Sequence, residues 1–232
     1  MTDTRDEHDT RLGLLDPLLP ASRQLPVPGP GDVALEVAGG RGLARLVKAD
    51  PSTLEATWNP AEQHVLTAHV GGDDPVASMA ALLVRWAEVV RDRAGNSDSA
   101  AALTWPSRDV AMTRLFLHHG LAPASVLAIR PAGRVSPVGT TDVVVRRSTG
   151  ADVETAVALE LELVRWNQRL GQMTERPNTA ELIRAKYASA NPPWFWLAEV
   201  GAEPVGLLTV LDPQRTPWPS ELTSSRTIEA RS

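Results

Sequence analysis

The sequence predicts an α+β protein, with a mixed, mostly antiparallel sheet flanked by helices, divided into two parts. The chain of 232 residues is 43% hydrophobic, which is enough to bury a core. Short β-rich runs around glycine turns alternate with runs whose apolar residues recur at the helical period. A stretch rich in proline, glycine and small polar residues separates the two parts.

The expected boundaries follow from these changes in composition. We expect a partly disordered N-terminal segment at 1–31, whose first ten residues are polar and charged, a folded unit at 32–131, a linker at 132–141, a second unit at 142–212, and an irregular tail at 213–232. Each unit can be divided further into expected helices and strands.

The first unit begins with a hairpin, because VALEVAGGRGLARLVKADP at 33–51 contains two strands around glycines that permit a tight turn. A strand at 64–70 leads into a helix from Pro75 to about Arg91, for which Asp74 is the expected N-cap. A strand at 101–105, a helix from about Arg108 to His119 ended by a left-handed Gly120, and a strand at 125–131 complete the unit.

The second unit begins with the strand DVVVRR at 142–147. Thr149 and Asp152 have capping-box spacing for a helix whose apolar stripe includes Val153, Val157 and Val164. Another helix follows Asn178 and extends to about residue 190. The segment WFWLAEVGAEPVGLLTVLDP at 194–213 then predicts a second hairpin.

Composition argues against several classes of partner and location. The net charge of -5 argues against nucleic acid and anionic membranes as partners, because proteins that bind either of them present a concentrated patch of positive charge. The chain has no cysteine, no signal-peptide pattern at its N-terminus and no apolar run near the ~20 residues that span a bilayer. We therefore expect a cytoplasmic protein whose partners are small molecules or other proteins.

The histidines do not have metal-ligand spacing. His118 and His119 are adjacent on a helix and point about 100° apart, and they suit the C-terminal end of that helix. His64 and His69 flank a strand that offers no further ligand at suitable spacing. No metal is expected.

The order from residue 142, a strand, two helices and a hairpin, resembles the first half of a GNAT-superfamily acyl-CoA N-acyltransferase. The residues that carry this likeness are Arg146, Thr149, Asp152, Ala198, Glu199, Val205 and Gly206. Residues 32–131 resemble the complementary elements of the same fold, with Gly120-Leu121 where the family has Gly-Phe. The resemblance implies two partial GNAT-like copies, the first of them degenerate.

The resemblance also implies a reaction, the transfer of an acetyl group from acetyl-CoA to an amine by direct attack. In the family, backbone N–H groups in a glycine-rich loop at a helix N-terminus hold the CoA diphosphate. Gly71 and Gly72 occupy the equivalent turn, but two aspartates and Pro75 follow them, and Phe116 stands where the family often has a tyrosine. We therefore expect weak or absent activity, and no catalytic residue is assigned.

The sequence after Leu211 is polar and broken by prolines, so we expect the second copy to stop after its third strand, through truncation or alteration of the chain. The residues expected to line an acceptor-amine site are Trp166, Gln172, Glu175, Trp194 and Trp196, with ordinary surface and core packing as the alternative for each. The acceptor is a small molecule or a protein amine.

Two other interpretations stay open. The chain could be a non-catalytic GNAT-like module that binds another protein or forms a homodimer. Alternatively, the two partial copies could pair into one composite sheet.

Overall fold

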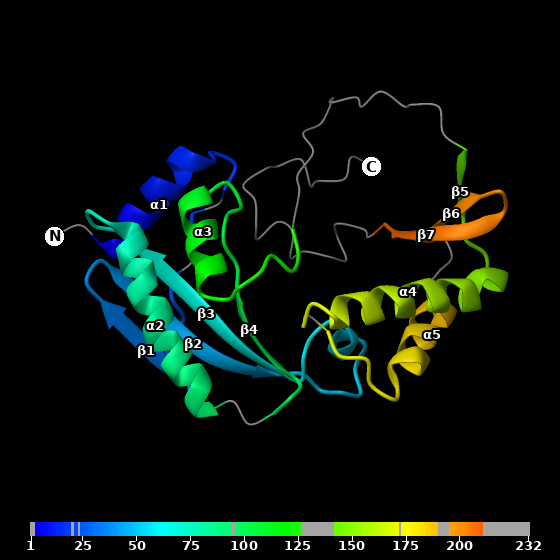
Figure 1. The fold of residues 1–232 in the computed structure, drawn as a ribbon, viewed down its shortest axis with the longest axis horizontal. Helices are drawn as coiled ribbons and strands as arrows, with labels where there is room; N and C mark the ends of the chain where they lie inside the picture. The colour runs from blue at the N-terminus through cyan, green and yellow to red at the C-terminus, as the bar shows by residue number, and fades with distance from the viewer. Residues whose placement is uncertain are drawn as a thin grey trace. The chain divides into compact units, whose positions relative to one another are not determined.

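The computed structural model describes residues 3–19, 21–22, 24–93, 96–126, 142–171, 173–189 and 195–210. These residues form two compact units. Unit 1 holds the described residues up to 48 together with 61–126, and unit 2 holds 49–60 together with 142–210. The α+β prediction is confirmed, since the described residues include a mixed four-stranded sheet, an antiparallel three-stranded sheet and five α-helices (Figure 1).

The sheet of unit 1 has the order β1-β2-β3-β4, formed by Val33–Val37, Gly40–Lys48, Glu62–Val70 and Ser99–Leu103. The first three strands are antiparallel, and β4 runs parallel to β3. A parallel pair needs a long crossover, and the helix α2, Pro75–Arg93, provides it. The predicted first hairpin is confirmed, with Gly39 at φ +69° in its turn.

The core of unit 1 lies between its sheet and the helices α2 and α3, the latter spanning Val110–His118. Its buried members are Leu35, Ala44, Leu66, Val70, Met79, Leu82, Leu83, Trp86, Met112 and Phe116. The predicted N-cap of α2 is confirmed, because the Asp74 carboxylate accepts from the Ala77 N–H at 2.9 Å. The predicted left-handed end of α3 is confirmed as well, with Gly120 at φ +80°.

The N-terminal segment differs from the expectation of disorder over its first ten residues. The helix α1 spans Thr4–Leu15, and Asp3 caps it by accepting from the Arg5 N–H at 3.2 Å. His8 and Leu12 are buried against the rest of unit 1. A composition rich in charge usually favours disorder, but here contacts with residues far along the chain stabilise the helix.

Unit 2 contains the antiparallel strands β5, Val143–Arg147, β6, Phe195–Val200, and β7, Glu203–Thr209. The predicted second hairpin is confirmed, and its turn residues Gly201 and Ala202 both have positive φ, as a type I′ turn requires. The described strands thus form two separate sheets and not the composite sheet considered above.

The two predicted helices of unit 2 are confirmed as α4, Val153–Gln168, and α5, Thr179–Ser189. The short 3-10 helix η2, Gly150–Asp152, precedes α4 and carries the predicted capping box of Thr149 and Asp152. The buried core consists of Ala156, Val157, Val164, Met173, Ile183, Tyr187 and Phe195.

A short segment between β2 and β3 belongs to unit 2. Residues 49–60 contain the 3-10 helix η1, Leu54–Thr57, and lie against α5 and the residues before it. The Arg176 guanidinium donates to the carbonyls of Ala56 and Asn59, and the Asn178 amide donates to the carbonyl of Pro51 at 2.9 Å. The local sequence gives no sign of this arrangement.

Several predictions concern residues outside the described ranges. They are the linker at 132–141, the tail at 213–232 and most of the strand expected at 125–131, of which Ser125 and Val126 are described and not in a strand. Among the helices that the structure describes, none is both long and apolar enough to cross a bilayer.

Candidate functional site

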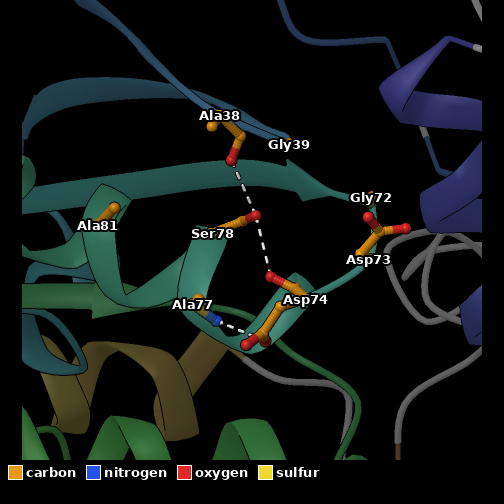
Figure 2. A pocket seen from close by; sticks show the side chains of 9 residues that line it. Ala38, Gly39, Gly72, Asp73, Asp74, Ala77, Ser78 and Ala81 are labelled. Carbon is orange, nitrogen blue, oxygen red and sulfur yellow. Dashed lines mark hydrogen bonds between the residues drawn. The ribbon is translucent and has the colours of Figure 1, made fainter.

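The turn between β3 and α2, residues 71–74, is where the family resemblance predicts the CoA diphosphate. It borders an open depression of about 350 Å³. The lining residues are Ala38, Gly39, Gly71, Gly72, Asp73, Asp74, Ala77, Ser78 and Ala81 (Figure 2). The predicted residues Gly71 and Gly72 therefore do lie at the edge of a concave surface.

This turn, which we call the glycine turn, is held against the first hairpin. The Gly71 N–H donates to the Gly39 carbonyl at 2.8 Å. A Cβ atom on Gly39 would lie 2.8 Å from the Gly71 carbonyl oxygen, so only glycine fits there. Gly72 has φ +76°, in the left-handed region that glycine adopts without strain. Gly71 and Gly72 thus serve the packing of the two turns against each other.

The N-terminus of α2 already carries a protein anion. The Asp74 carboxylate turns back onto the Ala77 N–H, and the Ser78 hydroxyl donates to the Asp74 carbonyl at 3.1 Å (Figure 2). Pro75, the first helical residue, has no N–H to offer. The positive end of the α2 dipole therefore already interacts with the helix's own N-cap, the Asp74 carboxylate.

A second carboxylate reaches the glycine turn from α1. Glu7 accepts from the Gly72 N–H at 2.7 Å, joining residues 65 positions apart. A Cβ atom on Gly71 would overlap the Glu7 side chain, so Gly71 makes room for it. With Asp73 and Asp74, three carboxylates now gather where a diphosphate would lie, and their charge opposes such a ligand.

The sequence interpretation missed Glu7, because it treated the first residues as disordered. The available signal was Asp3, an N-cap residue followed by Asp6 and Glu7 in the first turn of a helix. That signal indicates a helix start, but nothing local indicates that Glu7 meets Gly72.

His8, next to Glu7, fixes α1 against β3. Its Nδ1 accepts from the Val70 N–H at 3.4 Å, and its ring lies 5.2 Å from the His69 ring and 5.3 Å from the Trp105 ring. Burial, reinforced by the neighbouring His69, lowers the pKa of His8 to about 4. His8 is therefore neutral at pH 7, as its role as a hydrogen-bond acceptor requires.

One turn further along α1, Arg11 forms an ion pair with the buried Asp109 at the start of α3. The same Asp109 carboxylate accepts from the Trp105 indole N–H at 2.9 Å. Phe116, which the resemblance aligns with a tyrosine of the family, lies in the core with its ring edge-on to Trp105 at 5.7 Å. It offers no hydroxyl for protonating a thiolate.

The residues predicted to line an acceptor site have separate partners. Trp166 is 60% exposed, with the Arg169 guanidinium 5.6 Å from its ring centre. Glu175 is bound by Arg165 at 2.9 Å, and this contact lowers the pKa of the Glu175 carboxyl, whose charge is therefore already compensated. Trp196 lies on β6 with Arg147 over its ring at 5.4 Å.

Trp166, Glu175 and Trp196 thus each have an arginine partner of their own, and their grouping into one acceptor site stays a prediction. Gln172 and Trp194, the other two predicted residues, lie outside the described residues.

A buried polar cluster in unit 2, which the sequence interpretation missed, joins α4 to α5. The Lys186 ammonium donates to both oxygens of Glu160, at 3.0 and 2.8 Å, and the Tyr187 hydroxyl donates to Glu160 as well. Lys186 also lies over the rings of Trp58, Tyr187 and Phe195, 4.9 to 6.0 Å from their centres. The sequence signal for this cluster was Glu160, a glutamate at a position of α4 where the helical pattern predicts an apolar residue.

The residues that carry the family likeness meet in a network at the end of β5. The Arg146 guanidinium makes two hydrogen bonds to Asp152, at 3.0 and 2.8 Å, and donates to Glu199 at 3.0 Å. The hydrogen bonds from Arg146 hold the pKa of Asp152 well below its usual range. The network ties the strand, the capping box and the second hairpin together.

The small residues of the same likeness also meet. Ala198 pairs with Gly206 across β6 and β7, and a Cβ atom on Gly206 would lie 3.4 Å from the Ala198 Cβ. Within the pattern Ala-Glu…Val-Gly, Glu199 is thus the ion-pair partner of Arg146, and Ala198 and Gly206 form a close contact between the two strands.

Within the described parts of the chain, no three histidine, aspartate or glutamate side chains are grouped so that they could hold a metal ion. Comparison with protein-family models, with curated proteins and with solved structures gives no match.

Proposed function

We propose that this chain is a GNAT-type acyl-CoA N-acyltransferase in tandem form. Unit 2 supplies the acceptor-side half of such a fold, and unit 1 is a degenerate copy. The reaction is the transfer of an acetyl group from acetyl-CoA to a small-molecule or protein amine, strongly impaired in this chain. No match to a known family supports this assignment, so it depends on the arrangement of the residues themselves.

The observation that carries the proposal is the network around Arg146. Arg146, Asp152 and Glu199 were selected from the sequence because their pattern resembles the family, and in the structure the Arg146 guanidinium donates to both carboxylates. A chance likeness between separate segments would not be expected to select residues in contact. The order β5-α4-α5-β6-β7 with antiparallel pairing supports the same assignment.

The impairment follows from the glycine turn. CoA binding in this manner needs free backbone N–H groups facing the diphosphate. Here the Gly72 N–H is bound by Glu7 and the Ala77 N–H by Asp74. Unit 1 therefore offers an acidic surface with occupied donors, which is unsuited to a polyanion.

In the proposed reaction the neutral amine attacks the thioester carbonyl carbon, so that a C–N bond forms and the C–S bond breaks. The nitrogen loses one proton and the departing thiolate gains one. None of the described residues is assigned to either proton transfer. Trp166 and Trp196 remain the proposed contacts to the acceptor, and each stacks with an arginine.

Calorimetry with acetyl-CoA, combined with an assay for CoA thiol release in the presence of a panel of primary amines, tests the proposal. We expect slow, amine-dependent thiol release and no binding in the micromolar range. Micromolar binding would contradict the impairment. Thiol release that does not exceed the uncatalysed rate with any amine would contradict acyl transfer itself.

A second candidate function is a non-catalytic module that binds a protein or a second copy of the chain. It is favoured by exposed aliphatic side chains on the sheet of unit 2, where Val144, Val145 and Leu208 are each more than half exposed. This function predicts a monodisperse species in sedimentation velocity with no CoA turnover. Slow amine-dependent turnover would instead favour the enzyme.

A further inference from the structure

We propose that helix α1 is an intramolecular cap on the glycine turn, in which the Glu7 carboxylate occupies the backbone donor that an external anion would use. The cap is a property of unit 1 alone. It holds whether or not the chain transfers acyl groups, so its test is independent of the proposed reaction.

The geometry of the contact is that of a bound anion. The Glu7 carboxylate lies 2.7 Å from the Gly72 nitrogen, within the range of a charge-assisted hydrogen bond. Gly71, the preceding residue, lacks the Cβ atom that would displace the carboxylate. A carboxylate and a phosphate present similar oxygens to an N–H donor, so Glu7 occupies this donor as a phosphate oxygen would.

Contacts other than that of Glu7 anchor the rest of α1. These contacts position the Glu7 carboxylate at the glycine turn. His8 is buried and accepts from the Val70 N–H. Arg11 pairs with the buried Asp109, and Arg108 lies 3.4 Å from Asp16 at the end of the helix. These contacts fix α1 along β3 and α3 and place Glu7 over Gly72.

The cap has a chemical consequence for the turn. With α1 in place, an incoming anion finds the Gly72 N–H occupied and a carboxylate directly beside it. With Glu7 removed, Gly72 has no protein acceptor in that position, while Asp74 still caps α2. The site exposed in this way would take a small oxyanion, and inorganic phosphate is the simplest probe.

The experiment is a titration of the ¹⁵N-labelled full chain with inorganic phosphate at constant ionic strength, observed at the Gly72 amide. Wild type, Glu7→Ala and Glu7→Gln are compared. The glutamine variant is the matched control, because its side-chain oxygen can still accept from Gly72. We expect Glu7→Ala to bind phosphate about tenfold or more tightly than wild type, the factor that a hydrogen bond to a charged group is worth.

A saturable shift of the Gly72 signal in Glu7→Ala, with an affinity about tenfold or more above that of wild type and of Glu7→Gln, would support the cap. No saturable shift in Glu7→Ala, or equal binding by all three chains, would overturn it. If Glu7→Ala does not fold, hydrogen exchange of the wild-type chain decides. The cap predicts that the Gly72 amide exchanges as slowly as the amides of α1, whereas rapid exchange at Gly72 with α1 protected would overturn the proposal.

Discussion

The Lys186 ammonium lies 2.8 Å from a carboxylate oxygen of Glu160, a side chain that is only 2% exposed. The pair joins α4 to α5 inside unit 2. Each charge is tolerated because the other is present, since an isolated buried charge is strongly unfavourable.

Replacing Lys186 by methionine should therefore lower the free energy of unfolding by about 3 to 5 kcal/mol, because it leaves the buried Glu160 charge without a cationic partner. Urea denaturation measures the loss. The double variant Lys186→Met/Glu160→Met removes both charges and should recover much of the stability. Additive losses in the double variant would show that the two side chains do not depend on each other.

Tyr187 should resist ionisation while the chain is folded. Burial raises the pKa of Tyr187, and its hydrogen bond to Glu160 raises it further. Because Tyr187 is the only tyrosine in the chain, the ultraviolet absorbance of tyrosinate reports on it directly. The folded state keeps the proton, so stability falls as the pH rises through the ordinary value of about 10.

We expect the tyrosinate absorbance to appear together with the loss of the far-ultraviolet circular dichroism signal, not before it. Titration at the ordinary pKa in a chain that is still folded would contradict the buried contact with Glu160.

Mild acid should destabilise the chain through His8. Its pKa is about 4 in the folded chain and about 6.5 in an unfolded one, so the unfolded state binds the proton more readily. The contribution to stability is complete above pH 6.5 and is lost as the pH falls toward 4. Denaturation midpoints measured across this range should decrease accordingly.

The variant His8→Gln cannot titrate but can still accept from the Val70 N–H, so it should flatten this pH dependence. His118→Gln, at the exposed end of α3, is the matched control for replacing a histidine by glutamine. An equal effect of both variants would remove His8 as the cause.

The close approach of the two turns in unit 1 should make Gly39 far more sensitive to substitution than Gly120. Both have positive φ, so alanine costs about 1 to 2 kcal/mol of backbone strain at either position. Only at Gly39 does the new Cβ meet the Gly71 carbonyl, whereas Gly120 has nothing within 4 Å. Thermal or urea unfolding of Gly39→Ala and Gly120→Ala should show this difference, and equal losses would contradict it.

Asp152 should matter for the stability of unit 2 both as a cap and as a partner of Arg146. Its carboxylate accepts from the Thr149 N–H at 2.7 Å and from the Arg146 guanidinium. Asp152→Ala should lower the free energy of unfolding by about 0.5 to 2 kcal/mol, the range measured when a capping side chain is replaced by alanine. Asp152→Asn keeps an acceptor for Thr149 and should lose less. A larger loss for asparagine than for alanine would be inconsistent with this role.

The elements that the sequence alone determined are those fixed by neighbouring residues. Gly39 and Gly201 mark the two hairpin turns, Asp74 and the pair Thr149 and Asp152 mark helix starts, and Gly120 marks a helix end. Capping and turn formation involve partners only a few residues away, so a linear pattern contains all that they need. For the same reason the predicted helices and hairpins are confirmed closely.

The tertiary structure decided what depends on distant partners. Helix α1 has a weak local signal and is held by Val70, Gly72 and Asp109. The segment at 49–60 joins unit 2 through Arg176 and Asn178. Such contacts stabilise the fold only when folding brings both residues together, so neither residue indicates the contact from its own position in the sequence. That is why the sequence placed the glycines of the turn correctly and could not show that Glu7 already occupies it.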